Sequence, residues 1–553
     1  MECSQRNMST PISDEAPVPT PPAPATVAYI AALDVGTTCV RCFVLDEKCL
    51  VKGSAVDEVE LLNPQPGFFE IEPECLWRKI VNVITLAIRD AKLTPAQITC
   101  LTISTQRCTF LTWNHETEEY YHNFITWKDL RAHELVDQWN SSWTKRSMNS
   151  VSFALYLVTR QPRFLAGSVL KLMNGQVTPR LLYEINNNQR LKQALHENKA
   201  RVELLDSWIL HKLRSGNGKN TNVEHITDVT SSTATGLYDP FTLSWSPFIS
   251  WLFGFDTKIL PRVVDNGYKD FGHVHPAAFG PDWDNTSIPI AASLSDQAAS
   301  MWGSQCFKKN DVKVTMGTGA FLNLNTGSKC RAATSGMYPL VAWQMKNNSK
   351  SQGGVYCIEG AAHDFGTVVT WAQSCELFKK PDETALIAKS VPDTNGVFFM
   401  PAFSGLGPPV NDYRSASGFI GLTPSTTKAH MVRALLESIV FRLVQLIDAT
   451  EKETSQKLKV IRVNGGVSRN DFVCQFLADL SGLKVERDEN TESSIMGATF
   501  MAGINHGIWK NFEDIKCFRK VERVFEPRLN VYEKVIERMD KWCGAIDRFS
   551  EWY

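Results

Sequence analysis

Two turns built from glycine and threonine carry the residues best suited to phosphate chemistry. The first interrupts an apolar run in "AALDVGTTCVRCFVLD", where Thr37, Thr38 and Cys39 follow Gly36. Such a turn points successive backbone N–H groups at one place, and glycine lets the chain approach an oxyanion closely. Taken alone, a turn of this kind is more often an ordinary tight hairpin than a phosphate site.

Two charged residues flank the first turn. Asp34 ends the apolar run before it, and Arg41 lies in the run after it. Mg2+ prefers one or two carboxylates together with phosphate oxygens, so we expect Asp34 to hold this ion through water. Arg41 would bring positive charge to the phosphates. The alternative is a solvated aspartate without a ligand.

Two later glycine turns follow a similar pattern. "VKVTMGTGAFLNLNTG" is again strand, turn and strand, with Gly317 and Thr318 at the bend. "VIRVNGGVSRNDFVCQF" is a strand, a glycine pair that includes Gly466, and a helix with Asn470 near its first turn. A helix N-terminus behind glycine suits a phosphate or a purine edge. In isolation it is as often a simple strand-to-helix connection.

Alternating strands and helices are predicted to position these turns. Segment 27–44 reads as strand, turn and strand, 75–93 has the apolar spacing of an amphipathic helix, and 98–105 reads as a buried strand. Helices are also expected around 180–213. The alternation indicates an α/β architecture with both sheet faces covered. A second unit begins near 305 with its own glycine–threonine hairpin, which suggests two duplicated domains that grip one ligand.

The composition favours a small neutral ligand. A net charge of -1 over 553 residues argues for neither nucleic acid nor an anionic membrane as a partner. No run of about 18 uncharged apolar residues occurs, so no membrane span is expected. Fourteen scattered cysteines predict free thiols and a cytoplasmic location. Residues 1–26, rich in Pro, Ser and Thr, are expected to form a disordered tail and not a signal peptide.

The order of these motifs resembles the FGGY family of carbohydrate kinases, and within it the glycerol kinases. "LDVGTTCVRCFVLD" looks like the first phosphate motif of that family, "VTMGTGAFLNLNTG" like the second, and "VNGGVSRNDF" like the adenosine motif. The resemblance covers about 28 to 510. It implies an α/β fold of two actin-like ATPase (ribonuclease H-like) domains around a central cleft, with ATP and Mg2+ as cofactors.

The resemblance also implies which domain holds which part of the site. The N-terminal domain, 27–304, would hold the first phosphate turn and the substrate pocket. The C-terminal domain, 305–515, would hold the second phosphate turn and the adenosine site, and 516–553 would be a helical extension. Four residues beyond the phosphate turns would border the nucleotide: Gly366 and Thr370 in "EGAAHDFGTVVTW", and Gly466 with Asn470.

The acceptor alcohol would lie between residues of several motifs. Asp296 in "SLSDQAASMWG" would be the base that takes the hydroxyl proton, and Gln297 would hold another hydroxyl. Local sequence alone favours a helix N-cap for this aspartate. By the same resemblance Arg107 would donate to hydroxyls, and Trp127 and Phe321 would wall the carbon chain. Core packing is the alternative for both aromatic residues.

Two residues depart from the glycerol-kinase pattern. Cys108 stands where that pattern has a glutamate, and Phe164 where it has a tyrosine. A thiol is a weak partner for a hydroxyl, and losing a charged hydrogen bond costs about 1.5–3 kcal/mol. The pocket is therefore expected to be less polar than a standard glycerol site.

Three functions fit the sequence. The first is ATP-dependent phosphorylation of glycerol to sn-glycerol 3-phosphate. The second keeps the chemistry with another small polyol or sugar as acceptor. The third is a nucleotide-binding regulatory protein with weak catalysis, because fold alone does not fix function. A homo-oligomer is one arrangement that the sequence leaves open.

Overall fold

The structure is a computed structural model. It describes residues 27–553 apart from 217–222, 268, 270, 281, 282, 284, 285 and 346–353. The tail expected over 1–26 lies outside the described residues. Within the described part of the chain, no helix combines the length and the apolar character needed to cross a membrane.

The first lobe is built on a mixed sheet in the order β3-β2-β1-β5-β13. Its strands are β1 (Tyr29–Val35), β2 (Cys39–Asp46), β3 (Val51–Glu58), β5 (Cys100–Thr105) and β13 (Ile290–Ser295). β1, β2 and β3 form an antiparallel meander, and β5 and β13 run parallel to β1. The opening hairpin and the buried strand expected at 98–105 are confirmed.

Both faces of this sheet are covered, as the apolar runs predicted. Alternate β1 residues Ala31 and Leu33 pack with α1 (Pro73–Asp90) and α7 (Leu205–Ser215). Their neighbours Ile30 and Ala32 face the other way, against α10 (Asp296–Gly303) and α15 (Ser493–Asn505). The period-two alternation of a strand therefore assigns successive residues to two separate cores.

The second lobe repeats the topology of the first. Its sheet has the order β16-β17-β15-β14-β20-β21-β22, and the inner run β17-β15-β14-β20-β21 corresponds to β3-β2-β1-β5-β13. The strands are β14 (Val312–Met316), β15 (Ala320–Gly327), β16 (Tyr338–Trp343), β17 (Val355–Ala362), β20 (Val460–Asn464), β21 (Lys484–Asp488) and β22 (Val521–Phe525). The expected duplication of an actin-like domain is confirmed by this repeated strand order.

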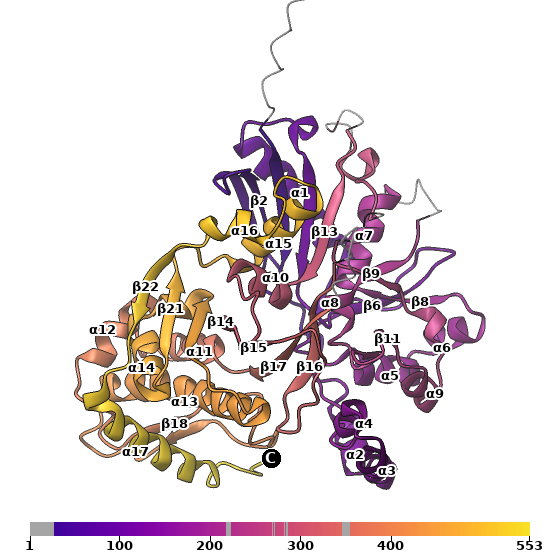
Figure 1. Cartoon of the computed structure of the whole chain (residues 1–553). Coiled ribbons are helices and arrows are strands. Elements are labelled where there is room, and N and C mark those ends of the chain that lie inside the picture. Colours follow the sequence, from indigo (N-terminus) through magenta and orange to yellow (C-terminus); the bar gives the residue numbers. More distant parts are fainter. Residues whose placement is uncertain are drawn as a thin grey trace, which may run out of the picture.

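Helices cover the outer face of the second sheet, and α10 and α15 lie between the two sheets (Figure 1). The outer helices are α11 (Gly366–Ser374), α12 (Thr384–Lys389), α13 (Lys428–Thr454), α14 (Asp471–Ser481) and α17 (Leu529–Ile546). Segment 516–553 is thus not only helical. It also contains β22, whose "VERVF" pairs antiparallel with β21 at the sheet edge.

An extra subdomain extends the first lobe beside the cleft. It contains a sheet of order β4-β7-β6-β8, made of β4 (Glu70–Ile71), β7 (Phe124–Ile125), β6 (Phe110–Asn114) and β8 (Ala200–Leu204). Its helices are α2 (His133–Ser141), α3 (Trp143–Thr159), α4 (Pro162–Gly167), α5 (Val177–Asn187), α6 (Gln189–His196) and α9 (Pro247–Phe253). Helices expected around 180–213 are thus α5, α6 and α7, with β8 between the last two.

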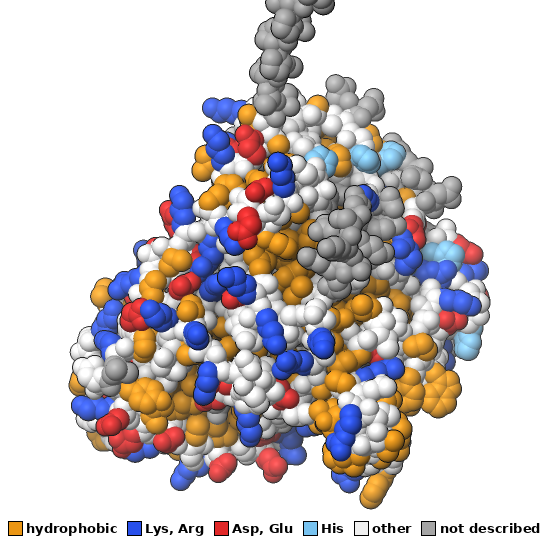
Figure 2. All heavy atoms as spheres, in the orientation of Figure 1, with side chains coloured by type: hydrophobic (Ala, Val, Ile, Leu, Met, Phe, Trp, Pro, Cys, Tyr) orange, Lys and Arg blue, Asp and Glu red, His pale blue; other side chains and the backbone are white. Residues whose placement is uncertain are grey.

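Shorter elements complete the connections. They are β9 (Ile226–Asp228), α8 (Val229–Ser232), β10 (Tyr238–Asp239), β11 (Ser244–Trp245), β12 (Arg262–Val264), β18 (Phe398–Met400), β19 (Gly418–Ile420) and α16 (Phe512–Ile515). Helices α2–α4 project from the body in Figure 1, and none of the residues of α3 is buried. Figure 2 shows hydrophobic side chains on this projection, with basic side chains among them.

Candidate active site

Both phosphate turns line one cavity between the two lobes. The turn between β1 and β2 contributes 36–39 and the turn between β14 and β15 contributes 317–319 to a cavity of about 2220 Å³. Each turn is closed by one backbone hydrogen bond: the N–H of Gly36 donates to Cys39 at 2.9 Å, and that of Gly317 donates to Gly319 at 3.0 Å. The structure thus brings together two turns that lie about half the chain apart.

The first turn is tied to neighbouring side chains. The hydroxyl of Thr37 donates to Oε1 of Gln106 at 2.8 Å and accepts from the indole Nε1 of Trp127 at 2.9 Å. Trp127 was expected only as an apolar wall of the acceptor site. Its ring also connects that wall to the phosphate turn.

Asp34 and Arg41 form an ion pair at the base of the first turn. Nη2 of Arg41 lies 2.6 Å from Oδ2 of Asp34, and Nη1 pairs with Glu492 of the second lobe. The hydroxyls of Ser104 and Ser494 donate to Asp34 at 2.7 and 3.2 Å. Although burial opposes the charge, the carboxylates of Asp34 and Glu492 raise the pKa of Arg41 above its ordinary value.

The donor set at Asp34 suits a phosphate-bound Mg2+ and not an all-protein metal cage. Among the described residues, no group of three or more His, Cys, Asp or Glu side chains converges on one point. Asp34 is 3% exposed yet lines the cavity beside the first turn. Mg2+ commonly takes one or two carboxylates and keeps water and phosphate oxygens as its other ligands, so one carboxylate here is sufficient.

Asp296 is the first residue of α10 and faces the same cavity. Ser295, not Asp296, holds the N-cap position. Oδ1 of Asp296 accepts from the backbone N–H of Gln297 at 2.7 Å, and Oδ2 accepts from its Nε2 at 3.2 Å. Burial raises the pKa of the Asp296 carboxyl, and the charges of Arg107 and Lys313 oppose that rise.

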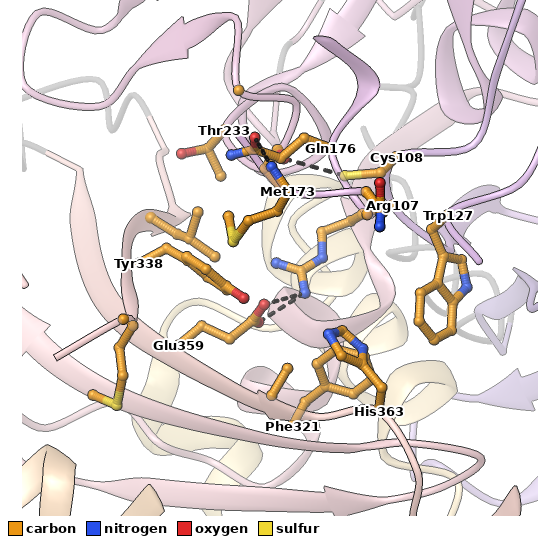
Figure 3. Close-up of a pocket in the computed structure, with 18 of the residues that line it drawn as sticks. Arg107, Cys108, Trp127, Met173, Gln176, Thr233, Phe321, Tyr338, Glu359 and His363 are labelled. Carbon is orange, nitrogen blue, oxygen red and sulfur yellow. Dashed lines mark hydrogen bonds and ion pairs between the residues drawn. The ribbon is translucent and has the colours of Figure 1, made fainter. Parts of the chain in front are cut away.

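A row of polar residues crosses the second sheet beneath Asp296. Lys313 on β14, Asn323 on β15 and Glu359 on β17 are direct partners in neighbouring strands. Nδ2 of Asn323 donates to Glu359 at 2.7 Å. Nη2 of Arg107 donates to both carboxylate oxygens of Glu359 at 2.6 and 2.7 Å (Figure 3). Nε of Arg107 lies 4.0 Å from Oδ1 of Asp296. Glu359 therefore fixes the arginine that was predicted to hold acceptor hydroxyls.

Lys313 connects this row to the acceptor residues. Its fully buried Nζ donates to Oε1 of Gln297 at 2.5 Å and to Oγ1 of Thr315 at 2.6 Å. Burial lowers the pKa of Lys313 to about 8. Because Lys313 occupies the oxygen of Gln297, the amide nitrogen is turned toward Asp296. Lys313 and Glu359 were not predicted as site residues, although each is the lone charge of its strand.

Aromatic rings form one wall of the acceptor region. The rings of Trp127 and Phe321 pack edge to face with centroids 6.0 Å apart, and Trp127 lies 6.2 Å from His363. These three side chains lie together in Figure 3, on one side of Arg107. Trp127 and Phe321 come from different lobes, so the wall is complete only when the lobes are in this arrangement.

Cys108 and Phe164 also line the cavity. The thiol of Cys108 donates to the carbonyl oxygen of Ala234 at 3.2 Å, and burial raises its pKa to about 11. At neutral pH this side chain is therefore uncharged. Phe164 lies on α4 of the projecting subdomain.

The four residues expected to border the nucleotide lie in different environments. Gly466 lines the cavity, and a Cβ there would meet no atom within 4 Å. Gly366 packs against the second turn instead, where a Cβ would lie 2.5 Å from the carbonyl oxygen of Gly317. Thr370 is exposed on α11, and the side chain of Asn470 caps α14. Nucleotide contact by all four residues, Gly366, Thr370, Gly466 and Asn470, stays a prediction.

Two family models and curated relatives match this chain. The N-terminal domain of the FGGY family of carbohydrate kinases matches residues 29–303, and its C-terminal domain matches 312–506. A protein named glycerol kinase 5 from Danio rerio is 41% identical over 533 residues, which covers 95% of this chain and 97% of the relative. A protein named glycerol kinase 2 from Thermotoga maritima is 31% identical over 530 residues, covering 95% and 99%.

Solved structures agree with these matches. The crystal structure of Plasmodium falciparum glycerol kinase with ADP has a TM-score of 0.81 and 27% identity, and the alignment covers 95% of this chain and 98% of that one. A xylulose kinase from Lactobacillus acidophilus shares the fold at a TM-score of 0.76 and 19% identity, with 94% and 98% covered. On this evidence the chain belongs to the FGGY family of carbohydrate kinases.

Proposed function

We propose that this chain is an ATP-dependent kinase that phosphorylates glycerol to sn-glycerol 3-phosphate. The observation that carries the proposal is the position of Asp296, whose carboxylate faces a cavity that both phosphate turns line. Relatives named glycerol kinase, at up to 41% identity over nearly the whole chain, support glycerol as the acceptor.

The residues around Asp296 suit phosphoryl transfer, which needs positioning and charge neutralisation more than covalent work by the protein. Asp296 accepts the proton of the attacking hydroxyl. The amide nitrogen of Gln297 and the guanidinium of Arg107 donate to hydroxyl oxygens of the acceptor, and the aromatic wall holds its carbon chain. Lys313 and Glu359 position Gln297 and Arg107.

The phosphate side is held by backbone and by charge. Both turns line the cavity, where their N–H groups would face the phosphate oxygens, and Arg41 would supply a cation beside the first turn. Bound Mg2+ supplies further neutralisation of the transferring group, and Asp34 is the residue that would hold it. Closure of the lobes over the reactants excludes water that would otherwise hydrolyse ATP.

We also infer that the protein works in a reducing compartment, the cytoplasm. Every cysteine in the described part of the chain is a free thiol, and most are buried or partly buried. Disulfides are rare in reducing compartments, whereas secreted proteins tend to use them.

The test compares Asp296→Asn with a matched exposed variant, Asp540→Asn on α17. ADP release with glycerol is measured together with ATP binding by titration calorimetry. Asp296→Asn is expected to abolish turnover and keep ATP binding, because the amide cannot accept the proton. Asp540→Asn is expected to behave as wild type. Full turnover by Asp296→Asn, or no glycerol 3-phosphate from wild type, would refute the proposal.

A further inference from the structure

The cavity extends well beyond the groups that the reaction uses. Its volume of about 2220 Å³ includes the nucleotide cleft and the acceptor site, and residues assigned to neither reactant also line it. Figure 3 shows Met173 and Tyr338 across Arg107 from Trp127. We call the part of the cavity on that side the side arm. The lining of the whole cavity includes the apolar residues Phe164, Leu170, Met173, Ala234, Met337 and Leu340. Of these, Met173 lies in the side arm in Figure 3, and Ala234 adjoins Cys108.

A chain of contacts links Cys108 to the side arm. The Cys108 thiol donates to Ala234. Gly236, two residues further on, lies so close to Gln176 that a Cβ there would be 3.0 Å from the Gln176 side chain. Oε1 of Gln176 accepts a hydrogen bond from the backbone N–H of Met173 at 3.2 Å. The side arm therefore begins at the acceptor site and is continuous with it.

Helix α3 forms the outer wall of the cavity on this side. Met148, Val151 and Leu155 line the cavity and follow the three-to-four spacing of one helix face. Val151 is 59% and Leu155 is 40% exposed. An apolar face that is left uncovered, and that is continuous with a binding site, is suited to an apolar part of the ligand.

The chemistry at the start of the side arm disfavours a free hydroxyl. The Cys108 thiol is neutral and already donates to Ala234, and Glu359 is occupied by Arg107 and Asn323. Glu359 already accepts three hydrogen bonds and a thiol is a weak partner, so a hydroxyl gains less here than it would beside a free carboxylate. An ether or ester oxygen carries no proton that needs an acceptor, and it can still accept a hydrogen bond from Arg107.

We propose that the preferred acceptor is a glycerol that carries one hydrocarbon chain at carbon 1, as an ether or an ester. This inference rests on the proposed function and names its substrate class. The free terminal oxygen attacks the γ-phosphorus of ATP, its proton passes to Asp296, and the bond between that phosphorus and the bridging oxygen breaks. The products are ADP and a 1-substituted sn-glycerol 3-phosphate, and the hydrocarbon chain lies in the side arm.

A chain-length series tests the proposal with non-hydrolysable ethers. The purified full chain is assayed for ADP release with glycerol and with 1-O-propyl-, 1-O-butyl- and 1-O-hexyl-sn-glycerol at monomeric concentrations, and products are identified by mass spectrometry. The expected kcat/KM rises with chain length, by up to about fourfold for each fully buried methylene. The mirror-image 3-O-hexyl-sn-glycerol is expected to gain no such advantage, since its chain replaces the reacting hydroxyl.

Variants of α3 assign the gain to the side arm. Leu155→Asp is expected to lower the ratio of kcat/KM for hexylglycerol to that for glycerol by at least about tenfold, because the chain then meets a carboxylate. Val158→Asp is the matched control. It is on the same helix, 84% exposed, and absent from the residues that line the cavity, so the ratio should not change.

The outcomes separate this inference from the proposed function. If glycerol is phosphorylated and hexylglycerol is no better than glycerol, or if Leu155→Asp leaves the ratio unchanged, the side-arm proposal is overturned and glycerol kinase activity stands. If neither compound is phosphorylated, both proposals fail.

Discussion

Replacement of Lys313 by methionine tests whether the buried lysine controls the acceptor residues. The change keeps an unbranched side chain of similar length and removes the charge and both hydrogen bonds. Gln297 then loses the donor that fixes its amide. A lost hydrogen bond to a charged group costs about 1.5–3 kcal/mol, so kcat/KM for the acceptor should fall about 10- to 150-fold.

The same variant should shift the pH profile. The positive charge of Lys313 lowers the pKa of Asp296, against the larger effect of burial. Asp296 works as a base only when ionised, so activity is lost as pH falls through its pKa. Without Lys313 that pKa rises further, and the acid limb of kcat/KM moves to higher pH.

The stability of the variant has an expected sign as well. The pKa of Lys313 is about 8 in the folded chain and near 10.5 in the unfolded chain. Between these values the unfolded chain binds the additional proton, so the free energy of unfolding of wild type should rise as pH increases through this window. At pH 7 the buried charge costs about 3 kcal/mol, at 1.36 kcal/mol for each pKa unit. Lys313→Met should therefore be no less stable than wild type at pH 7.

The assay is ADP release from pH 5 to 10, combined with thermal unfolding over the same range. Lys309→Met, at an exposed position in the same segment, is the control. An unchanged acid limb together with an unchanged kcat/KM would refute the positioning role of Lys313. A large loss of thermal stability would show that it is needed for folding instead.

Three substitutions test other parts of the cleft. Gly466→Val should keep the wild-type melting temperature and raise the KM for ATP at least about tenfold, because its side chain extends into open cavity; an unchanged KM would contradict the nucleotide assignment. Gly366→Val should lower the melting temperature as well as ATP affinity, since its Cβ would push on Gly317; a stable variant would contradict that packing. Trp127→Phe keeps an aromatic ring but loses the indole hydrogen bond to Thr37, which is worth about 0.5–1.5 kcal/mol. Its kcat/KM should fall about 2- to 12-fold, and no loss would show that the bond is dispensable.

Much of the fold was predictable because its signals are local. Glycine and threonine between two apolar runs specify a hairpin in either lobe, and both hairpins formed as expected. Apolar runs without polar alternation indicated sheets covered on both faces, as the separate cores on the two sides of β1 confirm. The strand β22 was missed because "VERVF" lies at a sheet edge, where two of its five side chains are charged and four are exposed.

The acceptor site was predictable only in part. Arg107, Asp296 and Gln297 came from motif resemblance, and the structure places them together at one cavity. Lys313 and Glu359 could not be assigned, because their meeting depends on the register of three strands that are separated along the chain. Local sequence also favoured Asp296 as a helix cap, whereas the preceding serine takes that position.

The crossing of α10 and α15 limits how the two lobes can move. A Cβ at Gly303 would collide with the backbone of Ser493, and one at Gly497 would collide with the backbone of Ala299. With no side chain between the two helix backbones, α10 and α15 are in close contact at this point, and we expect the lobes to open mainly by rotation about this crossing. Asp296, at the start of α10, lies close to that axis, so opening the cleft is expected to move the two glycine–threonine turns through a wider arc than it moves the proposed base.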